Sequence, residues 1–491
     1  MNAVIRFMFV TVLCLMAVDS PARAQNRDSF EEFRQGIKSD FQSFRKTILE
    51  DYDKYLDGIW KEYQAFRGVE RNELPKPKRP PIADPDNRLP EVEIPAPKEP
   101  QPSVEPQNAP IQPSPASLPT VLGQNQLPFY FFDFLVSAAK TGLEEDAANL
   151  ENLKYGELWR LYENRKIADA ALPTLRRIAA EYTLNDWLTL ELIRSYAARV
   201  FPASGSRLRI SLAHYLLCHF GFDIRIGEES SPEKPYPDPM LLIPTEQTVY
   251  ARPGCTINGK TYYLFYDDPY TNNGDIPFLT FDLPQDGNGR ALDLVIRKPL
   301  TIPYSPHKYH FRYGNMEISG EMNGALMPLL RNYPQIPFES YAVSRVDVRL
   351  RESVSAQISR QLGTLSQHQA VDKLLQFVQK AFEYATDSDL HGFEKPYFFE
   401  EMLFYPKCDC EDRSIFYSYL LWNVLKVENH IIRYPRHASV AVHLDVPVSG
   451  DGYTYDGKKY YISDPTYIGA VTGMCMPEYR SVRPEIDFFT R

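Results

Sequence analysis

The chain has 491 residues and a formal net charge of −10 at pH 7. This length allows two or three domains, and the acidic balance excludes a general nucleic-acid binder, which would need a basic surface. The 32 tyrosines and 28 phenylalanines provide enough large apolar side chains for extensive hydrophobic cores.

The first 24 residues have the pattern of a secretory signal peptide. Arg6 supplies a positive start, residues 7–18 form an apolar run too short to span a bilayer, and Ala22-Arg23-Ala24 is a small-x-small cleavage site. No later segment has about 18 consecutive apolar residues, so we expect no membrane span in the mature chain. We therefore expect a periplasmic or secreted protein without a lipid anchor.

Removal of residues 1–24 leaves an odd number of cysteines, namely Cys218, Cys255, Cys408, Cys410 and Cys475. In an oxidising compartment an odd number implies at least one free thiol. The cysteines are also too few for a disulfide scaffold.

Residues 28–68 are expected to form one long amphipathic helix. Apolar residues recur from Phe30 to Phe66 at steps of 3, 4 and 4, an eleven-residue repeat of about 3.67 residues per turn. Ser29 and Glu32 make a capping box at its start. At 1.5 Å per residue the helix would be roughly 58 Å long. A stripe of this length needs a partner, so we expect a coiled coil or a docking helix; a helix folded back on the body is the alternative.

Residues 69–120 are expected to be a disordered, proline-rich linker. The stretch 74–120 holds 15 of the 41 prolines and few large apolar residues, so it cannot build a core. Such a segment extends by up to about 3 Å per residue and lets the body search a volume around the helix.

Residues 121–491 have the pattern of a globular α+β body. Helical periodicity dominates 127–226 and 352–426, and strand-like stretches such as KTYYLFY, ASVAVHL and KYYISD fill much of the rest. We divide this body into a first domain at 121–275, a β-rich connector at 276–350 and a second domain at 351–491.

Three residues of the second domain have the order and setting of a catalytic triad. Cys410 precedes an apolar helical run, so it is expected at a helix N-terminus, where the helix dipole favours a thiolate. His437 opens a strand-like run, and Asp464 ends a later strand that follows an Asp-Gly turn. A nucleophilic thiol needs a base within hydrogen-bond reach, and the imidazole needs an acceptor that fixes its tautomer. This layout can supply both from neighbouring elements.

The segments CDCEDRSIFYSYLL, HASVAVHLD and GKKYYISDPTY resemble the three core motifs of transglutaminase-like cysteine enzymes, a branch of the papain-like fold. The resemblance covers about 368–480. It implies a helix packed on an antiparallel sheet, with Cys410 as the nucleophile, His437 as the general base and acid, and Asp464 as the residue that orients His437. It implies no metal and no organic cofactor. Cys408 stands where the family has a glycine, and the backbone N–H of Cys410 is the one oxyanion donor that can be assigned.

Other roles for these residues remain open. Cys408 and Cys410 also fit a pair of buried inert thiols, a strained regulatory disulfide, or a zinc site completed by His437 and Asp464. His430 and His443 are competing bases.

The first domain repeats parts of the second. SGSRLRISLAHYLLCHFGFDIRIG runs like CDCEDRSIFYSYLLWNVLKVENHIIRY, and INGKTYYLFYDDPY runs like YDGKKYYISDPTY. In this register Ser206 stands in place of Cys410, and no histidine occurs between His219 and His307. We interpret 121–275 as a degenerate transglutaminase-like domain and 351–491 as the catalytic one; coincidence between two helix-then-hairpin segments is the alternative.

Together these features predict an exported thiol hydrolase that acts on an amide or peptide bond through a thioester. Its substrate would be a peptide or protein, and residues 28–68 would bind a partner or a second copy. Hydrolysis is expected over cross-linking, because nothing in the chain is dedicated to a second amine substrate. A non-enzymatic periplasmic scaffold that keeps the fold and the triad is the alternative.

Overall fold

The computed structural model describes residues 76–83, 125–202, 206–229, 239–266, 278–281, 283–284 and 288–489. All of them belong to one compact unit, 67–491. The predicted signal peptide at 1–24 and the predicted helix at 28–68 lie outside the described residues, and so does the predicted linker at 69–120 apart from 76–83.

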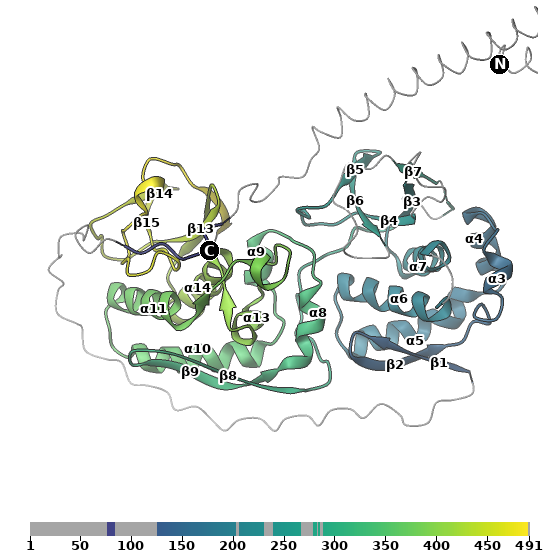
Figure 1. The fold of residues 1–491 in the computed structure, drawn as a ribbon, viewed down its shortest axis with the longest axis horizontal. Helices are drawn as coiled ribbons and strands as arrows, with labels where there is room; N and C mark the ends of the chain where they lie inside the picture. Colours follow the sequence, from purple (N-terminus) through teal and green to yellow (C-terminus); the bar gives the residue numbers. More distant parts are fainter. Residues whose placement is uncertain are drawn as a thin grey trace, which may run out of the picture. The chain divides into compact units, whose positions relative to one another are not determined.

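The described residues form two lobes of helices and antiparallel sheet, which confirms the α+β class (Figure 1). The first lobe starts with a hairpin, continues through helices and ends in a five-stranded sheet. Its hairpin is β1 (Gln126–Phe131) and β2 (Phe134–Ala139). Its helices are α3 (Ala147–Leu150), α4 (Tyr155–Asn164), α5 (Ile167–Glu181), α6 (Asp186–Val200) and α7 (Ser206–Phe220). Its sheet consists of β3 (Arg225–Glu229), β4 (Pro239–Ile243), β5 (Gly254–Ile257), β6 (Lys260–Tyr266) and β7 (Phe278–Thr280).

The second lobe follows the same plan with additional short elements. Its hairpin is β8 (Pro306–Tyr313) and β9 (Met316–Asn323), followed by a 3₁₀ turn at Gly324–Leu326. Its helices are α8 (Met327–Arg331), α9 (Phe338–Val343), α10 (Val348–Leu362), α11 (Gln367–Ala381), α12 (Asp387–Leu390), α13 (Phe399–Phe404) and α14 (Cys410–Leu425). Two short strands, β10 (Glu383–Tyr384) and β11 (Lys407–Cys408), pair in parallel. The main sheet consists of β12 (Asn429–Tyr434), β13 (His437–Val442), β14 (Gly452–Tyr455), β15 (Lys458–Ile462) and β16 (Glu485–Phe489), with a 3₁₀ turn at Pro477–Tyr479 before β16.

The two main sheets have the same strand order. The first runs β5-β6-β4-β3-β7 and the second β14-β15-β13-β12-β16, with every neighbouring pair antiparallel in both. In chain order, each strand of the first sheet therefore has a counterpart at the same place in the second. The helix before each sheet also packs alike: α7 lies on β3 and β4, and α14 lies on β12 and β13.

Matching turns close the corresponding hairpins of the two sheets. Asp456 and Gly457 join β14 to β15 with φ of 49° and 76°, and Asn258 and Gly259 join β5 to β6 with φ of 52° and 77°. Positive φ at both central residues is the two-residue hairpin turn that Asn-Gly and Asp-Gly favour. The Asp-Gly turn predicted before Asp464 is confirmed.

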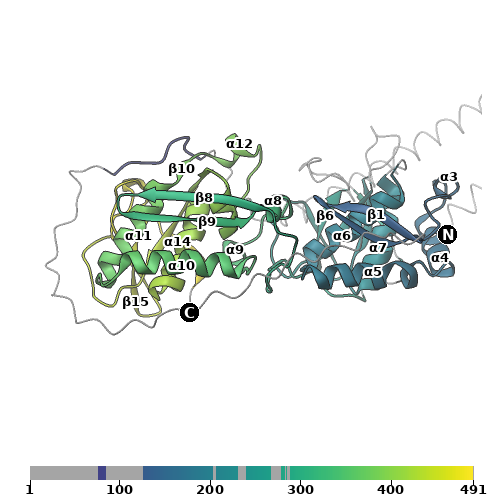
Figure 2. The same cartoon turned by 90° about the horizontal axis from the view of Figure 1, so that it is seen from below.

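The second lobe starts earlier than the sequence division placed it. The hairpin β8–β9 packs on α10 and α11, as β1–β2 packs on α5 and α6 in the first lobe (Figure 2). Residues 306–323 therefore pack with the second lobe, whereas the sequence division places them in the connector at 276–350. The alternation in this hairpin is visible in the sequence, but the helices that cover it are not.

Helix α14 is the centre of the second lobe. It packs on α9, α10, α11 and α13 as well as on the sheet. Every residue from Cys410 to Ser418 is buried, which is the pattern of a helix surrounded on all sides. Lys426, in the left-handed conformation with φ of 55°, follows its last residue. Side chains at the start of α14 are thereby placed between the sheet and the other helices.

Residues 76–83 depart from the linker prediction. Ile82 forms a parallel bridge with Ile468, and the side chain of Lys76 is buried against the second lobe. These residues are the purple segment in Figures 1 and 2. This stretch has no hydrophobic periodicity, and it nevertheless makes a defined contact with the second lobe.

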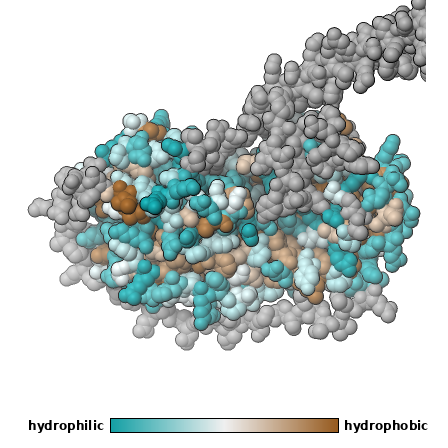
Figure 3. Space-filling view, viewed as in Figure 1, coloured by the Kyte–Doolittle hydropathy of each residue, from teal (hydrophilic) through white to brown (hydrophobic). Residues whose placement is uncertain are grey.

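No helix in the described ranges combines the length and the apolar character needed to cross a membrane. Figure 3 shows one face of the molecule on which hydrophilic residues dominate and hydrophobic residues form separate patches.

Candidate active site

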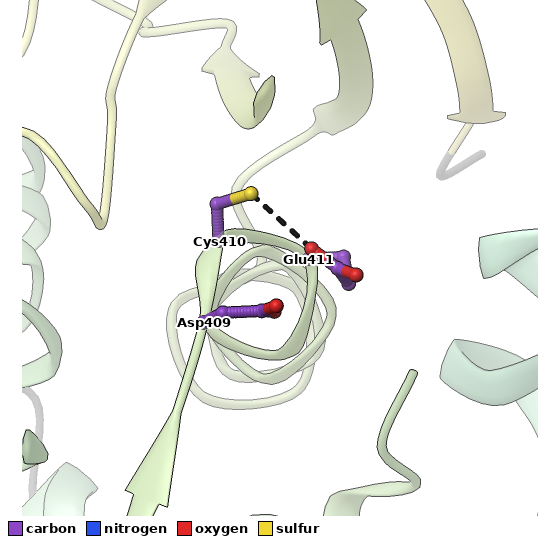
Figure 4. Close-up of side chains that lie close together, drawn as sticks. All are labelled: Asp409, Cys410 and Glu411. Carbon is purple, nitrogen blue, oxygen red and sulfur yellow. Dashed lines mark hydrogen bonds between the residues drawn. The ribbon is translucent and has the colours of Figure 1, made fainter. Parts of the chain in front are cut away.

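Cys410 is the first residue of α14, as the sequence predicts, and it is buried. The backbone N–H of Asp409 donates to Asp412 Oδ2 at 3.1 Å, a capping bond that fixes where the helix begins. The Cys410 thiol donates to Glu411 Oε2 at 3.2 Å (Figure 4). The thiol is therefore at the helix N-terminus, but its hydrogen bond goes to a carboxylate.

The surroundings of Cys410 favour the neutral thiol. Burial and the neighbouring Glu411 raise the pKa of Cys410 well above its usual value, and Asp409 adds to this effect. Lys76 and the backbone N–H of Ala438 act in the opposite direction, but they do not outweigh it. The predicted thiolate is wrong for this arrangement, because desolvation and negative charge exceed the help that a helix N-terminus gives.

His437 and Asp464 form a hydrogen-bonded pair. His437 begins β13, and Asp464 follows the end of β15, which pairs with β13. His437 Nε2 and Asp464 Oδ2 are 2.7 Å apart, and both residues are buried. Asp464 Oδ1 accepts from the backbone N–H groups of Thr466 at 2.8 Å and Tyr467 at 3.1 Å. With an acceptor at Nε2, the neutral ring carries its proton there and offers Nδ1 as a base.

Cys410 lies beside this pair without a hydrogen bond to it. The backbone N–H of Ala438, the residue after His437, stabilises the sulfur of Cys410, so the sulfur is next to the start of β13. Within the described part of the chain, no hydrogen bond joins Cys410 Sγ to His437. The ring of His437 stacks on Tyr479, with 5.6 Å between centroids and 1° between planes. The base and its orienting acid are thus assembled, and the thiol is adjacent but turned to Glu411.

Gln379 holds the loop that carries Asp464. This buried side chain comes from α11, and its amide nitrogen donates to the carbonyls of Asp464 at 3.0 Å, Tyr467 at 2.8 Å and Ala470 at 3.1 Å. Its amide oxygen accepts from the N–H of Gly469 at 3.0 Å. Because one side chain contacts four backbone groups, with two N–H donors shared among three carbonyls, the loop has little freedom to move relative to α11.

Cys408 has a separate, structural setting. Its sulfur accepts from Arg413 Nε at 3.4 Å and donates to the carbonyl of Glu383 at 3.6 Å. The guanidinium of Arg413, fully buried, also donates to the carbonyls of Gln379 and Phe382 at the end of α11. A cation at a helix C-terminus is favourable because unpaired carbonyls point there. Cys408 therefore belongs to a helix-capping contact.

Neither the disulfide nor the zinc site considered for these residues matches the contacts that the residues make. All five cysteines among the described residues are free, so Cys408 and Cys410 form no disulfide. The four proposed zinc ligands do not form one group among the described residues, because Cys408 contacts Arg413 and the carbonyl of Glu383 and is not with the pair of His437 and Asp464.

The competing histidines are also engaged away from Asp464. His430 Nδ1 is 2.8 Å from the hydroxyl of Tyr453, and His443 Nδ1 is 2.9 Å from the carbonyl oxygen of Lys459. Of these three histidines, His437 is the one that is paired with the predicted acid.

Four carboxyl groups converge in front of α14. Oxygens of Asp387, Glu394, Asp409 and Glu411 lie within 4.8 Å of one another. The ammonium of Lys76 enters this group: it is 2.7 Å from Asp409 Oδ2 and also contacts Glu411 and Glu394. We call these four carboxyl groups the acidic pocket.

The charges in the acidic pocket are unequal. Burial works against the ionised form of Glu411, but Lys76 and a hydrogen bond from Asp409 lower its pKa to about 2. Burial and neighbouring acids raise the pKa of Asp387 and Asp409 well above the usual range, and that of Glu394 to about 7. Burial alone would lower the pKa of Lys76, yet Asp409 and Glu411 raise it. The ammonium therefore pairs chiefly with ionised Glu411, while protons on the other acids limit the repulsion.

A pocket of about 520 Å³ adjoins the base. Its lining includes Tyr434, Tyr453, Tyr479 and Arg480, and Tyr479 is the ring that stacks on His437. Cys410, His437 and Asp464 do not line it themselves. It is therefore a candidate site for a neighbouring part of a ligand and not for the reacting bond.

Tyr384 is a further polar group near the thiol. Its hydroxyl is buried and has no hydrogen-bond partner among the described residues. Burial and the nearby Cys410 raise the pKa of Tyr384, so the hydroxyl keeps its proton and remains a donor.

Several of these residues could not be found from the sequence. Asp409 and Glu411 flank Cys410, so the motif contained them, but the sequence did not show that Asp387 and Glu394 complete a cluster with them. Lys76 lies in a proline-rich stretch without periodicity, and no sequence signal pointed to it. The strand that carries Tyr384 is two residues long, too short for a pattern.

The first lobe lacks the reactive residues at the corresponding places. Helix α7 begins at Ser206 where α14 begins at Cys410, and β4 begins at Pro239 where β13 begins at His437. Neither a thiol nor an imidazole stands at these two positions.

A scan against protein-family models and a search of curated proteins each gave no match for this chain.

Proposed function

We propose that the second lobe is a transglutaminase-like thiol hydrolase with a papain-like fold, which cleaves an amide or peptide bond in an exported or periplasmic setting. The observation that carries this proposal is the buried hydrogen bond between His437 and Asp464 next to a cysteine at the start of the central helix. A base held in one tautomer, beside a thiol, is the arrangement that nucleophilic catalysis by cysteine requires.

In the proposed reaction, the sulfur of Cys410 first leaves Glu411 and gives its proton to His437 Nδ1. The thiolate attacks the substrate carbonyl carbon and forms a tetrahedral intermediate. The C–N bond then breaks, the leaving amine takes the proton from His437, and a thioester remains on Cys410. Water loses a proton to His437 and attacks the thioester; the acid product leaves and the thiol is restored.

The negative oxygen of the tetrahedral intermediate needs hydrogen-bond donors. The backbone N–H of Cys410 is one, since it lies in the first turn of α14 and has no partner within the helix. The buried hydroxyl of Tyr384 is the second donor that we propose, because it lacks another partner among the described residues.

The first lobe fits the proposal as a degenerate copy of the catalytic one. Its sheet has the same strand order and the same two-residue turn, while Ser206 and Pro239 replace the nucleophile and the base. A copy without chemistry would bind substrate or a partner, or bury one face of the active lobe.

A second function, a binding protein that keeps the triad without using it, is favoured by one observation. The thiol of Cys410 donates to Glu411, and burial together with that acid raises the pKa of Cys410. Catalysis requires this bond to break, whereas binding does not.

Alkylation of Cys410 by iodoacetamide at pH 7 distinguishes the two functions. Mass spectrometry gives the rate at Cys410 and, in the same sample, at Cys408 as an inert thiol. If His437 acts as base, His437→Ala slows labelling of Cys410 by about 10²-fold or more, in line with the usual contribution of a general base. His443→Ala is the matched control and leaves the rate unchanged. Equal rates in the wild type and His437→Ala would contradict the proposed chemistry.

A further inference from the structure

Residues 76–83 are held at two ends. The ammonium of Lys76 enters the acidic pocket, and its side chain is only 4% exposed. At the other end, the N–H of Ala83 donates to the carbonyl of Ile468 at 2.9 Å, and the N–H of Ile468 donates to the carbonyl of Pro81 at 2.8 Å. Ile468 belongs to the loop that carries Asp464, and Lys76 reaches the start of α14. The segment therefore contacts the start of α14, which carries Cys410, and the loop that carries Asp464.

The prolines of this segment favour an extended backbone conformation. Lys76 precedes Pro77, which disfavours helical backbone at Lys76, and Pro80 and Pro81 fix their own φ near the extended region. Seven residue steps at about 3.3 Å give a reach of roughly 23 Å. An already extended chain loses less entropy on docking than a flexible one.

The acidic pocket is built to receive a small cation. Asp409 Oδ1 and Asp387 Oδ1 are fully buried and have no hydrogen-bond partner among the described residues, so the site holds buried polar oxygens beyond those that Lys76 uses. A buried ammonium is stable only with paired charge and hydrogen-bond acceptors around it. The acceptors lie within 4.8 Å of one another, which suits a compact ammonium better than a planar guanidinium. The neighbouring Lys78 and Arg79 are exposed, so charge alone does not select the occupant.

We propose that the acidic pocket is a binding site for the ammonium of a lysine on an extended, proline-flanked peptide segment, and that residues 76–83 occupy it as an intramolecular ligand. A peptide of the same chemistry, on a substrate or a partner, would compete for the site. The binding itself is independent of the proposed chemistry. Only its consequence for catalysis, that the docked Lys76 pairs with the two acids that flank Cys410, rests on the proposed function.

Amide hydrogen exchange in the full chain tests this proposal, with the peptide that contains Ile468 as the reporter. Lys76→Met removes the ammonium and keeps the length of the side chain, so exchange at Ile468 is expected to accelerate at least about tenfold. Lys78→Met, two residues along and exposed, is the matched control and leaves exchange unchanged. Lys76→Arg is expected to behave like Lys76→Met, because the guanidinium does not fit.

Addition of a ligand in trans tests the site itself. A synthetic peptide with the sequence LPKPKRPPIA, residues 74–83, is expected to restore protection at Ile468 in the Lys76→Met protein. The same peptide with methionine for the first lysine is expected not to do so. Ala83→Glu provides a second way to release the segment, since it disturbs the far end and leaves the acidic pocket intact. Unchanged exchange in both Lys76→Met and Ala83→Glu, or equal protection by the two peptides, would overturn the proposal.

A divalent cation is the other ligand that four carboxyl groups can attract. If millimolar calcium chloride removed protection at Ile468 in the wild type, the pocket would be a metal site from which Lys76 is displaced, and the proposal would be wrong. We expect no such effect. These readouts do not involve His437, so failure of the ammonium site and failure of the thiol chemistry are recorded by different experiments.

Discussion

Replacement of Asp464 by asparagine is predicted to reverse the tautomer of His437. Asp464 Oδ1 accepts two backbone N–H groups, from Thr466 at 2.8 Å and Tyr467 at 3.1 Å, and Oδ2 faces His437 Nε2. In Asp464→Asn the amide oxygen takes the place of Oδ1, because an NH₂ group there would leave two buried N–H donors unpaired, at about 1–3 kcal/mol each. The NH₂ group then faces Nε2, which must accept, and the ring proton moves to Nδ1.

Asp464→Asn is predicted to change the free energy of unfolding little and the reactivity of Cys410 strongly. The hydrogen bond to the ring is kept with reversed polarity, so the free energy of unfolding should fall by only about 1 kcal/mol. The ring can no longer accept a proton at Nδ1, so alkylation of Cys410 at pH 7 should slow by about 10²-fold or more.

Two measurements check this reasoning independently. The ¹⁵N shifts of the His437 ring report the tautomer whether or not the protein is an enzyme, and alkylation of Cys410 reports the base. Asp445→Asn, an exposed acid of the same lobe, is the control. An unchanged ring tautomer in Asp464→Asn would refute the assignment of the two carboxylate oxygens, and an unchanged alkylation rate with a reversed tautomer would refute the role of Nδ1.

Two further predictions concern stability, both measured by urea denaturation. Gln379→Ala removes the two N–H donors and the one acceptor that hold the loop of Asp464 and should lower the free energy of unfolding by about 3 kcal/mol, at roughly 1 kcal/mol per bond. Gln376→Ala on the same helix should cost under about 1 kcal/mol, and equal losses would contradict the bracing role. Burial lowers the pKa of His430 to about 4, so the folded ring stays neutral while the unfolded one, with a pKa of about 6.5, takes a proton. Stability from His430 is therefore full above pH 6.5, is lost progressively as the pH falls from 6.5 to 4, and is lower by up to about 3 kcal/mol below pH 4. His430→Phe should lose this part of the pH dependence, and parallel wild-type and mutant pH profiles would argue against it.

The parts of the site that local pattern controls could be predicted from the sequence. The apolar run after Cys410 placed it at the start of a helix, and Asp456-Gly457 placed a hairpin before Asp464. The order of these elements allowed a histidine to meet Asp464, and the choice of His437 over His430 and His443 came mostly from the resemblance to transglutaminase-like enzymes.

The parts that depend on distant segments could not be predicted. The ionisation of Cys410 depends on burial and on the distant Lys76 as well as on the adjacent Glu411 and Asp409, so the rule for a helix N-terminus alone gave the wrong protonation state. The docking of Lys76 depends on shape and charge in three dimensions, and composition alone assigned its segment to a linker. The start of the second lobe near Pro306 depends on which helices cover a hairpin, which strand alternation does not encode.

The contact between Lys76 and Asp409 joins residues 333 positions apart in the chain. During synthesis from the amino terminus, Lys76 emerges long before any residue of its receptor exists. The acidic pocket is complete only after Glu411 has been added and the second lobe has folded around α14. Docking of the segment is therefore one of the last steps in the folding of the newly made chain, and a chain truncated before residue 409 retains Lys76 without Asp409 and Glu411. Protection at Ile468 would then serve as a marker that a given molecule has been finished, and not only folded in part.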